Sequence, residues 1–579
     1  MDWRDRFRAG SIYAASVARR NPARGVAVTD RDGSEEAYAW DVESGTLRRL
    51  TDASTAVLEA VIEPDGESVV YLHDETGSEL GHLRRVPFDG GTGVDLTPDL
   101  PPYAAESLVA TDRLIAAVAA ETDRQHLLTI LDGVPRLAPQ DDLVDTLVAA
   151  DDGSFVATAE PMEGLTTRTI VRSTADGSEI GRLDLSRPGA AHGRTLAVAL
   201  HVDGWLRPAT WTPGEEPRRI GIDAPGDVVP TDWLPDGSTI LLQQLHRGTG
   251  GLWLHDVASG STTQLHRPDG APLAWGRPFL LGRDAAATLW SSAEMPRSVV
   301  RMTRDGSGVL LAAAGATRYP GAAWAEVTFP SSDDSECQGW LLRPAGDGPW
   351  PTNLSAHGGP TSVVGPGFSA IGQAWVDHGF AFLTVNYRGS TTFGDAYREA
   401  LTGRVGEADV ADMVAAHRWL LESGTARPDL VILNGWSWGG YLTLQTMATN
   451  PGRWAAGIAG APVADWIVAT EDQLAGLDAY DRALFGTTLA EDRESRIRAS
   501  PRTHVAEFDA PVLITTPRED SRTPIRQIEA FVQDMRAAGK EIRLDVVPGG
   551  HAGIGQEHWI AIMESWLAYA GDIVSRSSR

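Results

Sequence analysis

Cysteine is almost absent from this chain, which has one, Cys337, among its 579 residues. A single thiol excludes any intrachain disulfide, and such usage is typical of a reducing compartment. Long apolar runs are missing as well, since stretches such as 114–120 are far too short to span a bilayer. The charged segment 1–8 is not followed by the apolar region of a signal peptide. We therefore expect a soluble cytoplasmic protein that does not engage membranes.

Positive charge is also scarce, because 50 Lys and Arg stand against 78 Asp and Glu, a formal net charge of −28. Such a surface repels phosphate backbones and anionic lipid, so nucleic acid is not an expected partner. The sequence contains no His-Glu-x-x-His, no paired cysteine ligands and no phosphate-binding glycine loop. We expect neither a metal nor a cofactor.

The most informative segment that is present is 431–441, Val-Ile-Leu-Asn-Gly-Trp-Ser-Trp-Gly-Gly-Tyr. An apolar β-branched strand, a Gly-x-Ser-x-Gly turn and helical periodicity follow one another there, as in the nucleophile elbow of an α/β-hydrolase. Gly435 and Gly439 leave room for a sharp turn that projects the serine side chain. With 61 glycines in the chain the pattern alone could be an ordinary turn. Ser437 is the candidate nucleophile if an acid and a histidine follow it.

Both partners occur downstream in the α/β-hydrolase order of Ser, acid, His. The segment 511–516 predicts a buried strand, and an acidic loop follows it. A helix with an apolar face and a strand over 542–547 come next, and His551 stands just beyond that strand between glycines. His551 is the candidate general base. Asp520 is the favoured acid, with three alternatives left open: Glu519, Asp509 and Asp545.

A His-Gly-Gly loop precedes the elbow, at 356–360. Loops of this type supply one oxyanion-hole amide in esterases and lipases, and the residue after the nucleophile supplies the other. The amides of Gly359 and Trp438 are therefore the expected oxyanion donors. A plain Gly-Gly turn is the alternative interpretation of this loop.

All of these motifs lie beyond residue 350, and the first half of the chain shows a different periodicity. Turn-like segments ending at Gly45, Gly90, Gly133, Gly177, Gly214, Gly260 and Gly306 recur about every 43 residues, which is the blade period of a β-propeller. A second series ends at Gly66, Gly153 and Gly237. A β-sandwich of this length would be unusually large.

We therefore predict a seven-bladed β-propeller over residues 25–318 and an α/β-hydrolase domain, a mostly parallel sheet flanked by helices, over 319–579. We expect the segment 1–24 to pack on the hydrolase domain.

This combination resembles the prolyl oligopeptidase family of serine peptidases, and most closely its acylaminoacyl-peptidase and dipeptidyl-aminopeptidase branches. The resemblance is specific in the last 230 residues or so and architectural in the propeller. It rests on the elbow 435–441, the loop 357–360, the stretch 386–390 with Gly394, the segment 461–466 and the loops of Asp520 and His551.

The resemblance implies three substrate-binding candidates. Arg522, two residues after the acid, would hold a substrate carbonyl, with a surface salt bridge as the alternative. Trp466 would line the first specificity pocket, with core packing as the alternative. His357 is the third candidate. The chain departs from the family pattern in two places. Thr515-Thr516 replaces the usual His-Gly before the acid, and Glu35-Glu36 lacks the surroundings of the amine-anchoring glutamate pair, so dipeptidyl cleavage is not supported.

We predict a serine hydrolase that cleaves amide bonds of short peptides through an acyl-enzyme, with the propeller as a size filter. One alternative transfers the acyl group to an amine, as a peptide ligase or macrocyclase does. Another is an esterase or amidase acting on a specialised metabolite, and a third is a catalytically silent scaffold, against which the complete Ser, Asp, His order argues. The expected partner is a short peptide or a small amide or ester, and the sequence is compatible with a homo-oligomer.

Overall fold

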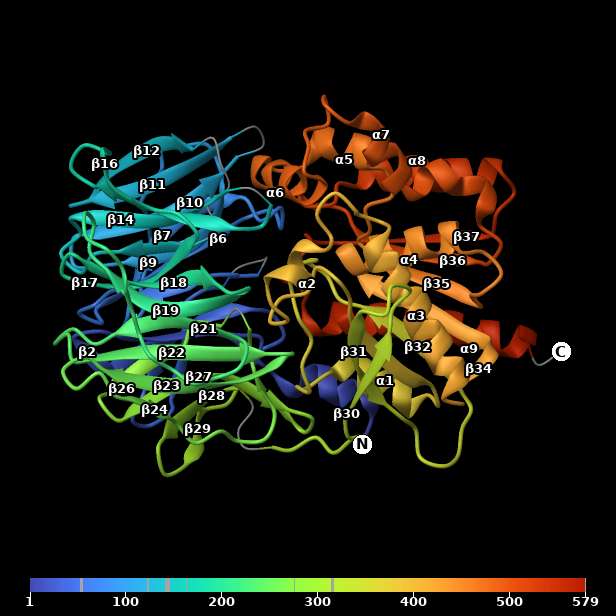
Figure 1. The fold of residues 1–579 in the computed structure, drawn as a ribbon, viewed down its shortest axis with the longest axis horizontal. Helices are drawn as coiled ribbons and strands as arrows, with labels where there is room; N and C mark the ends of the chain where they lie inside the picture. The colour runs from blue at the N-terminus through green and yellow to red at the C-terminus, as the bar shows by residue number, and fades with distance from the viewer. Residues whose placement is uncertain are drawn as a thin grey trace. The chain divides into compact units, whose positions relative to one another are not determined.

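The computed structural model describes residues 1–52, 56–121, 124–140, 146–162, 164–274, 276–313 and 317–577. The chain forms two compact units (Figure 1). The propeller unit comprises Ala9–Arg318 with Leu474–Tyr480, and the hydrolase unit comprises Met1–Arg8, Tyr319–Gln473 and Asp481–Arg579.

The described part of the propeller unit contains seven antiparallel sheets, each built from one continuous segment, which confirms the predicted seven-bladed fold. The strands of the first three sheets are β1 (Ile12–Ala18), β2 (Asn21–Thr29), β3 (Glu36–Asp41), β4 (Leu47–Arg49); β5 (Ala60–Ile62), β6 (Ser68–Asp74), β7 (Gly81–Pro87), β8 (Val94–Asp95); β9 (Ala104–Ala110), β10 (Leu114–Ala120), β11 (Gln125–Leu131) and β12 (Val134–Gln140). Those of the other four are β13 (Leu147–Ala149), β14 (Phe155–Pro161), β15 (Thr167–Ser173), β16 (Glu179–Leu183); β17 (Ser186–His192), β18 (Thr195–Val202), β19 (Trp205–Trp211), β20 (Arg218–Arg219); β21 (Asp227–Trp233), β22 (Thr239–His246), β23 (Thr249–Asp256), β24 (Thr262–Gln264); β25 (Ala271–Pro272), β26 (Phe279–Gly282), β27 (Ala285–Ser292), β28 (Met295–Thr303) and β29 (Ser307–Leu311).

The turns that revealed the repeat occupy the same place in every blade. Each of the seven joins the last two strands of its blade, from 41–45 between β3 and β4 to 304–306 between β28 and β29. The second series joins first and second strands, as Gly66 does between β5 and β6. First strands of consecutive blades contact one another, β1 with β5 and β5 with β9, so they lie innermost. The ring closes where β1 packs on β27 and β28.

The expected start of the propeller at residue 25 is too late. The strand β1, Ile12–Ala18, pairs with β2 and belongs to the first blade, with Ile12 and Ala18 buried. Only Met1–Arg8 groups with the hydrolase unit. There Trp3 and Phe7 of the 3-10 helix η1 (Trp3–Ala9) pack against the hydrolase core. The difference arises because the turn between β1 and β2, at Arg19-Arg20, contains no glycine of the kind that marks the turns of the repeat.

The hydrolase unit is built on an eight-stranded sheet in the order β30-β31-β33-β32-β34-β35-β36-β37. Its strands are β30 (Ala325–Pro330), β31 (Glu336–Leu342), β32 (Trp350–Ala356), β33 (Ala381–Asn386), β34 (Ala426–Trp436), β35 (Ala456–Gly460), β36 (Val512–Pro517) and β37 (Ile542–Val547). The pairs β30–β31 and β31–β33 are antiparallel, and the remaining neighbours are parallel. The carboxyl ends of β34, β36 and β37 therefore meet at one edge, as a mostly parallel α/β-hydrolase sheet requires.

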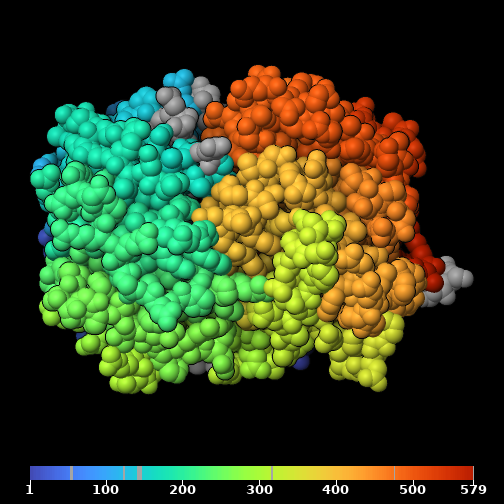
Figure 2. All heavy atoms as spheres, viewed as in Figure 1, coloured from blue at the N-terminus to red at the C-terminus, as the bar shows by residue number. Residues whose placement is uncertain are grey.

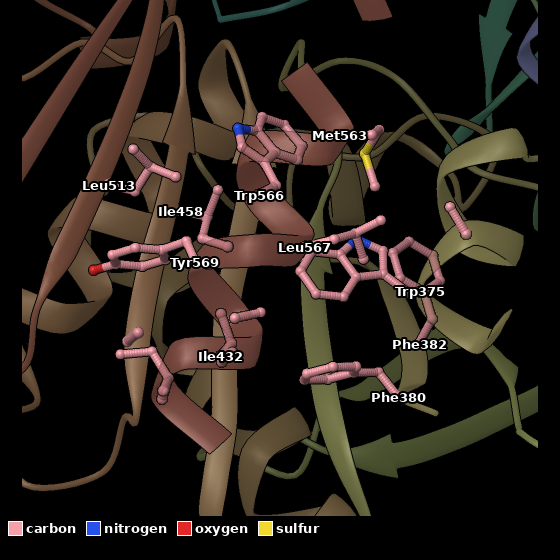
Figure 3. Packing of buried hydrophobic residues seen from close by; sticks show 14 of the residues in the cluster. Trp375, Phe380, Phe382, Ile432, Ile458, Leu513, Met563, Trp566, Leu567 and Tyr569 are labelled. Atoms are coloured by element: carbon pink, nitrogen blue, oxygen red, sulfur yellow. The ribbon is translucent and has the colours of Figure 1, made fainter. Parts of the chain in front are cut away.

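Among the described residues, five helices pack on this sheet: α1 (Ala370–Asp377), α3 (Ala408–Glu422), α4 (Trp438–Thr449), α8 (Ile525–Ala537) and α9 (Gln556–Ser577). The unit also contains α2 (Asp395–Glu399), α5 (Trp466–Asp472), α7 (Arg493–Ala499) and the 3-10 helix η2 (Pro501–Glu507). The helix α6 (Ala475–Phe485) begins in the segment that groups with the propeller unit. The long helix α9 buries Trp566 and Met563 against Ile432 and Ile458 of the sheet, and Trp375 of α1 completes this core (Figure 3). In the space-filling view the side chains fill the gaps that the ribbons leave within each unit (Figure 2). No helix in the described part of the chain is long and apolar enough to cross a membrane.

Candidate active site

Ser437 occupies a strained turn between β34 and α4. Its φ of 60° and ψ of −122° are unusual for a residue with a side chain, and such a conformation persists only where its surroundings fix it. A Cβ on Gly439 would lie 2.1 Å from the Ala356 carbonyl oxygen, and one on Gly435 would lie 2.4 Å from the Gly439 carbonyl. Both glycines are therefore required for close backbone approach, and the predicted elbow is present in the structure.

His551 and Asp520 meet beyond the ends of β37 and β36. The imidazole Nδ1 lies 2.7 Å from Oδ2 of Asp520, and both side chains are buried. The carboxylate also accepts hydrogen bonds from the Arg522 and Thr523 amides, at 2.9 and 2.8 Å, and from the Thr523 hydroxyl at 2.9 Å. Burial raises the pKa of Asp520, but the His551 charge and these hydrogen bonds outweigh it and leave the pKa below its usual value. These contacts keep Asp520 ionised beside the His551 imidazole.

The three alternative acids have other partners. Glu519 accepts the Gly549 amide at 3.1 Å, and Asp509 accepts the Gly452 amide at 2.6 Å. Asp545 bonds Arg543 at 2.8 Å and Ser565 at 2.6 Å. Asp520 is the carboxylate that the structure brings to His551.

The His-Gly-Gly loop lies beside the elbow. A Cβ on Gly358 would be 3.4 Å from Cβ and 3.9 Å from Oγ of Ser437. Gly359 has a φ of 128°, which favours glycine. Trp438 opens α4, so its amide belongs to the first turn, where N–H groups point out of the helix. The loop and the start of the helix thus flank the Ser437 side chain.

His357 makes its contacts within the protein. Nδ1 lies 2.7 Å from the Gly358 carbonyl, Nε2 lies 2.9 Å from the Ser390 hydroxyl, and the ring stacks on Tyr387 at 4.4 Å. Burial lowers its pKa to about 4, so the ring is neutral at physiological pH. These contacts give His357 a role in holding the glycine loop.

Trp466 is 3% exposed and stands in an aromatic cluster, defined as Trp438, Tyr441, Trp466 and Phe485. Its ring centroid lies 5.6 Å from that of Trp438, 5.2 Å from Tyr441 and 5.4 Å from Phe485. This burial favours the core-packing alternative for Trp466. The role of the Arg522 side chain toward a substrate stays a prediction, whereas its main chain holds Asp520.

Sequence reasoning overlooked Thr523, which supports Asp520 and whose hydroxyl also lies 3.4 Å from His551 Nδ1. The spacing Asp-x-x-Thr is typical of a carboxylate that accepts the amides two and three residues ahead, and this signal was available. Gln527 was also missed, because its partners in 462–465 are distant in sequence.

The fold and site define a protein with a β-propeller and an α/β-hydrolase domain that carries an elbow serine. Residues 366–573 match the model of the prolyl oligopeptidase family, and this part of the chain belongs to that family.

Two curated relatives illustrate the similarity. Acylamino-acid-releasing enzyme 2 of Oryza sativa subsp. japonica is 27% identical over 348 residues, covering 55% of this chain and 45% of that protein. Dipeptidyl aminopeptidase BIII of Pseudoxanthomonas mexicana is 28% identical over 256 residues, covering 42% of this chain and 36% of that protein. The chain matches less than half of the length of these relatives.

Solved structures match along nearly the whole chain. A puromycin-hydrolyzing peptidase of Mycobacterium tuberculosis aligns with a TM-score of 0.84 at 20% identity, covering 99% of this chain and 96% of the other. An acylaminoacyl peptidase in complex with Z-Gly-Gly-Phe-chloromethyl ketone aligns with a TM-score of 0.71 at 16% identity, covering 98% and 96%. At these identities the match establishes the shared fold.

Proposed function

We propose that this chain is a serine peptidase that cleaves amide bonds of short peptides through an acyl-enzyme. The observation that carries the proposal is the buried His551–Asp520 pair, 2.7 Å apart, at the sheet edge where the strained Ser437 ends β34. The family match of residues 366–573 and the names of the relatives support a peptide bond as the target.

In the proposed reaction the Ser437 hydroxyl attacks the substrate carbonyl while His551 takes the hydroxyl proton. Asp520 holds the imidazole with Nδ1 protonated and stabilises the imidazolium that forms. The amides of Gly359 and Trp438 donate to the tetrahedral oxyanion, an interaction whose loss costs about 10²–10³ in rate in known cases. His551 then protonates the leaving amine. In the second half His551 takes a proton from water as the water attacks the acyl carbonyl, and returns that proton to the Ser437 oxygen as the acid product leaves.

The substrate class is a short peptide or an aminoacyl amide. Puromycin belongs in the test panel because a structural neighbour is a puromycin-hydrolyzing peptidase. N-acylated peptides belong there because of the acylamino-acid-releasing relatives. The size filter by the propeller remains part of the proposal, as do a cytoplasmic location and the preference for water over an amine as acyl acceptor.

The nucleophile is tested by labelling with a fluorophosphonate probe. We expect Ser437→Ala to lose labelling while a control variant in α9, Ser575→Ala, keeps it. Stoichiometric labelling of the Ser437→Ala protein would refute the assignment.

The substrate class is tested by a peptide-library digest read by mass spectrometry, with puromycin, acylated peptides, aminoacyl-nitroanilides and simple esters as separate additions. Products that gain water indicate hydrolysis, and products that lose water indicate ligation. Digestion of a stable folded protein as fast as a tripeptide would contradict the size filter.

A further inference from the structure

The end of β35 and the segment that follows it contact the nucleophile elbow. The amide of Ser437 donates to the Gly460 carbonyl at 2.9 Å, and the next residue, Ala461, donates its amide to Thr515 O at 2.8 Å. Ala461 itself has a φ of 40°, which is rare for a residue with a side chain. Because the conformation of Ser437 is strained, the position of this segment matters to the serine.

Gln527 fixes that segment through both halves of its carboxamide. Its side-chain oxygen accepts the Ala464 amide at 2.6 Å and the Asp465 amide at 3.3 Å. Its nitrogen donates to the Pro462 carbonyl at 3.0 Å. Gln527 is fully buried, so these main-chain groups have no access to water as a substitute partner.

The place of Gln527 in the fold joins two parts of the site. It lies in the first turn of α8, directly after the loop in which Thr523 bonds Asp520. The segment that it holds leads from Gly460, the acceptor of the Ser437 amide, to Trp466, whose ring packs on that of Trp438. The Gln527 side chain therefore links the loop of Asp520 to the segment that contacts Ser437 and Trp438.

We propose that Gln527 is a positioning residue that keeps the elbow serine aligned with the His551–Asp520 pair. This inference rests on the proposed function, because it assigns Gln527 to the chemistry of Ser437. A residue that served stability alone would leave the reactivity of the folded enzyme unchanged.

The chain contains a matched control that separates a positioning role from a role in stability alone. Gln373 of α1 is also buried, and its carboxamide likewise binds the main chain of a distant segment, accepting the Ala322 amide at 2.9 Å and donating to the Ala322 carbonyl at 2.8 Å. Its partner precedes β30, the edge strand at the opposite end of the sheet from β36 and β37. Loss of Gln373 should therefore affect folding and leave the elbow in place.

The test compares Gln527→Met with Gln373→Met in the full chain, at a temperature where both are folded by circular dichroism. We expect Gln527→Met to slow fluorophosphonate labelling of Ser437 by about 10- to 100-fold, the order found when reacting groups are displaced by about 1 Å. The value of kcat should fall in proportion, with KM nearly unchanged. Gln373→Met should label and turn over at the rate of the unchanged protein.

A second variant, Gln527→Glu, allows the proposal to be tested if Gln527→Met does not fold. Gln527→Glu retains the acceptor for the Ala464 amide and loses the donor to Pro462 O, so we expect an intermediate labelling rate. A normal labelling rate in folded Gln527→Met or Gln527→Glu would overturn the inference. Labelling that survives Ser437→Ala would overturn the proposed function instead, so the two failures are distinguishable.

Discussion

The Nδ1 atom of His551 lies 2.7 Å from Oδ2 of Asp520, in a pair whose side chains are 8% and 0% exposed. In such a pair the carboxylate fixes which ring nitrogen carries the proton and leaves the other free to accept one. The tautomer of His551 thus depends on one buried contact. The first two predictions concern this contact.

Asp520→Asn should lower kcat by about 10³–10⁴, because the amide favours the wrong tautomer of His551 while it preserves the shape of the site. Steady-state hydrolysis of an aminoacyl-nitroanilide measures the effect. The control is Glu519→Gln in the same loop, whose side chain accepts the Gly549 amide and not His551. Activity of Asp520→Asn within tenfold of the unchanged enzyme would be incompatible with the assignment of the acid.

Thr523→Val removes the hydroxyl that donates to Asp520 at 2.9 Å and leaves the backbone amides in place. That hydroxyl is one of the groups that lower the pKa of Asp520. We expect the Asp520 pKa to rise toward its usual value, so that less of the free energy of unfolding is lost as the pH falls below about 4. Urea titrations at neutral and acid pH measure the change, and Thr523→Ser, which keeps the hydroxyl, should lose as much stability at acid pH as the unchanged enzyme.

Gly439→Ala should abolish fluorophosphonate labelling, because its Cβ would stand 2.1 Å from a backbone oxygen and the elbow must shift to admit it. Gly571→Ala is the control, since nothing lies within 4 Å of its Cβ position in α9. In a helix interior that substitution should stabilise by about 0.5–1 kcal/mol. Retained labelling of Gly439→Ala would mean that the turn tolerates a side chain.

Asp409 in α3 is fully buried, and burial raises its pKa from 3.8 to about 7, although the Val410 amide donates to it at 3.0 Å. The folded protein therefore binds this proton more tightly than the unfolded chain does. The resulting stability is present below pH 4 or so and is lost as the pH rises through about 7, a change of a few kcal/mol at about 1.4 kcal/mol per pKa unit.

Asp409→Asn cannot ionise, so its free energy of unfolding relative to the unchanged protein should increase between about pH 5 and about pH 8. Urea titrations at both pH values measure the difference, with the exposed Asp99→Asn as control. A difference that stays constant with pH would show that Asp409 does not titrate in this range.

Cys337 lies in β31 with no exposed surface, and burial raises the pKa of its thiol far above the usual range. Because the thiolate is the reactive form, we expect no reaction with a disulfide reagent such as dithionitrobenzoate in the folded protein. One equivalent should react in denaturant. Rapid labelling of the native protein would contradict the burial of this strand.

Local signals in the sequence were sufficient for the architecture. The turn between the last two strands recurs in every blade, so its spacing alone revealed seven blades. The elbow was equally readable, because a buried strand, two glycines and a helix must be adjacent in sequence for the turn to form. The predicted boundary at residue 25 was wrong because the turn after β1 contains no glycine. The strand β1 is recognised only by its pairing with β2.

The sequence by itself determined which residue types stood at the ends of β34, β36 and β37, since parallel strands bring their carboxyl ends to one edge. Local pattern favoured Asp520, but only the tertiary structure decided that Asp520 meets His551 while Glu519, Asp509 and Asp545 bind other partners. It also decided that His357 and Trp466 pack within the protein, and that Gln527 holds the segment behind the elbow. Those contacts join residues tens of positions apart, so no periodicity or spacing along the chain could reveal them.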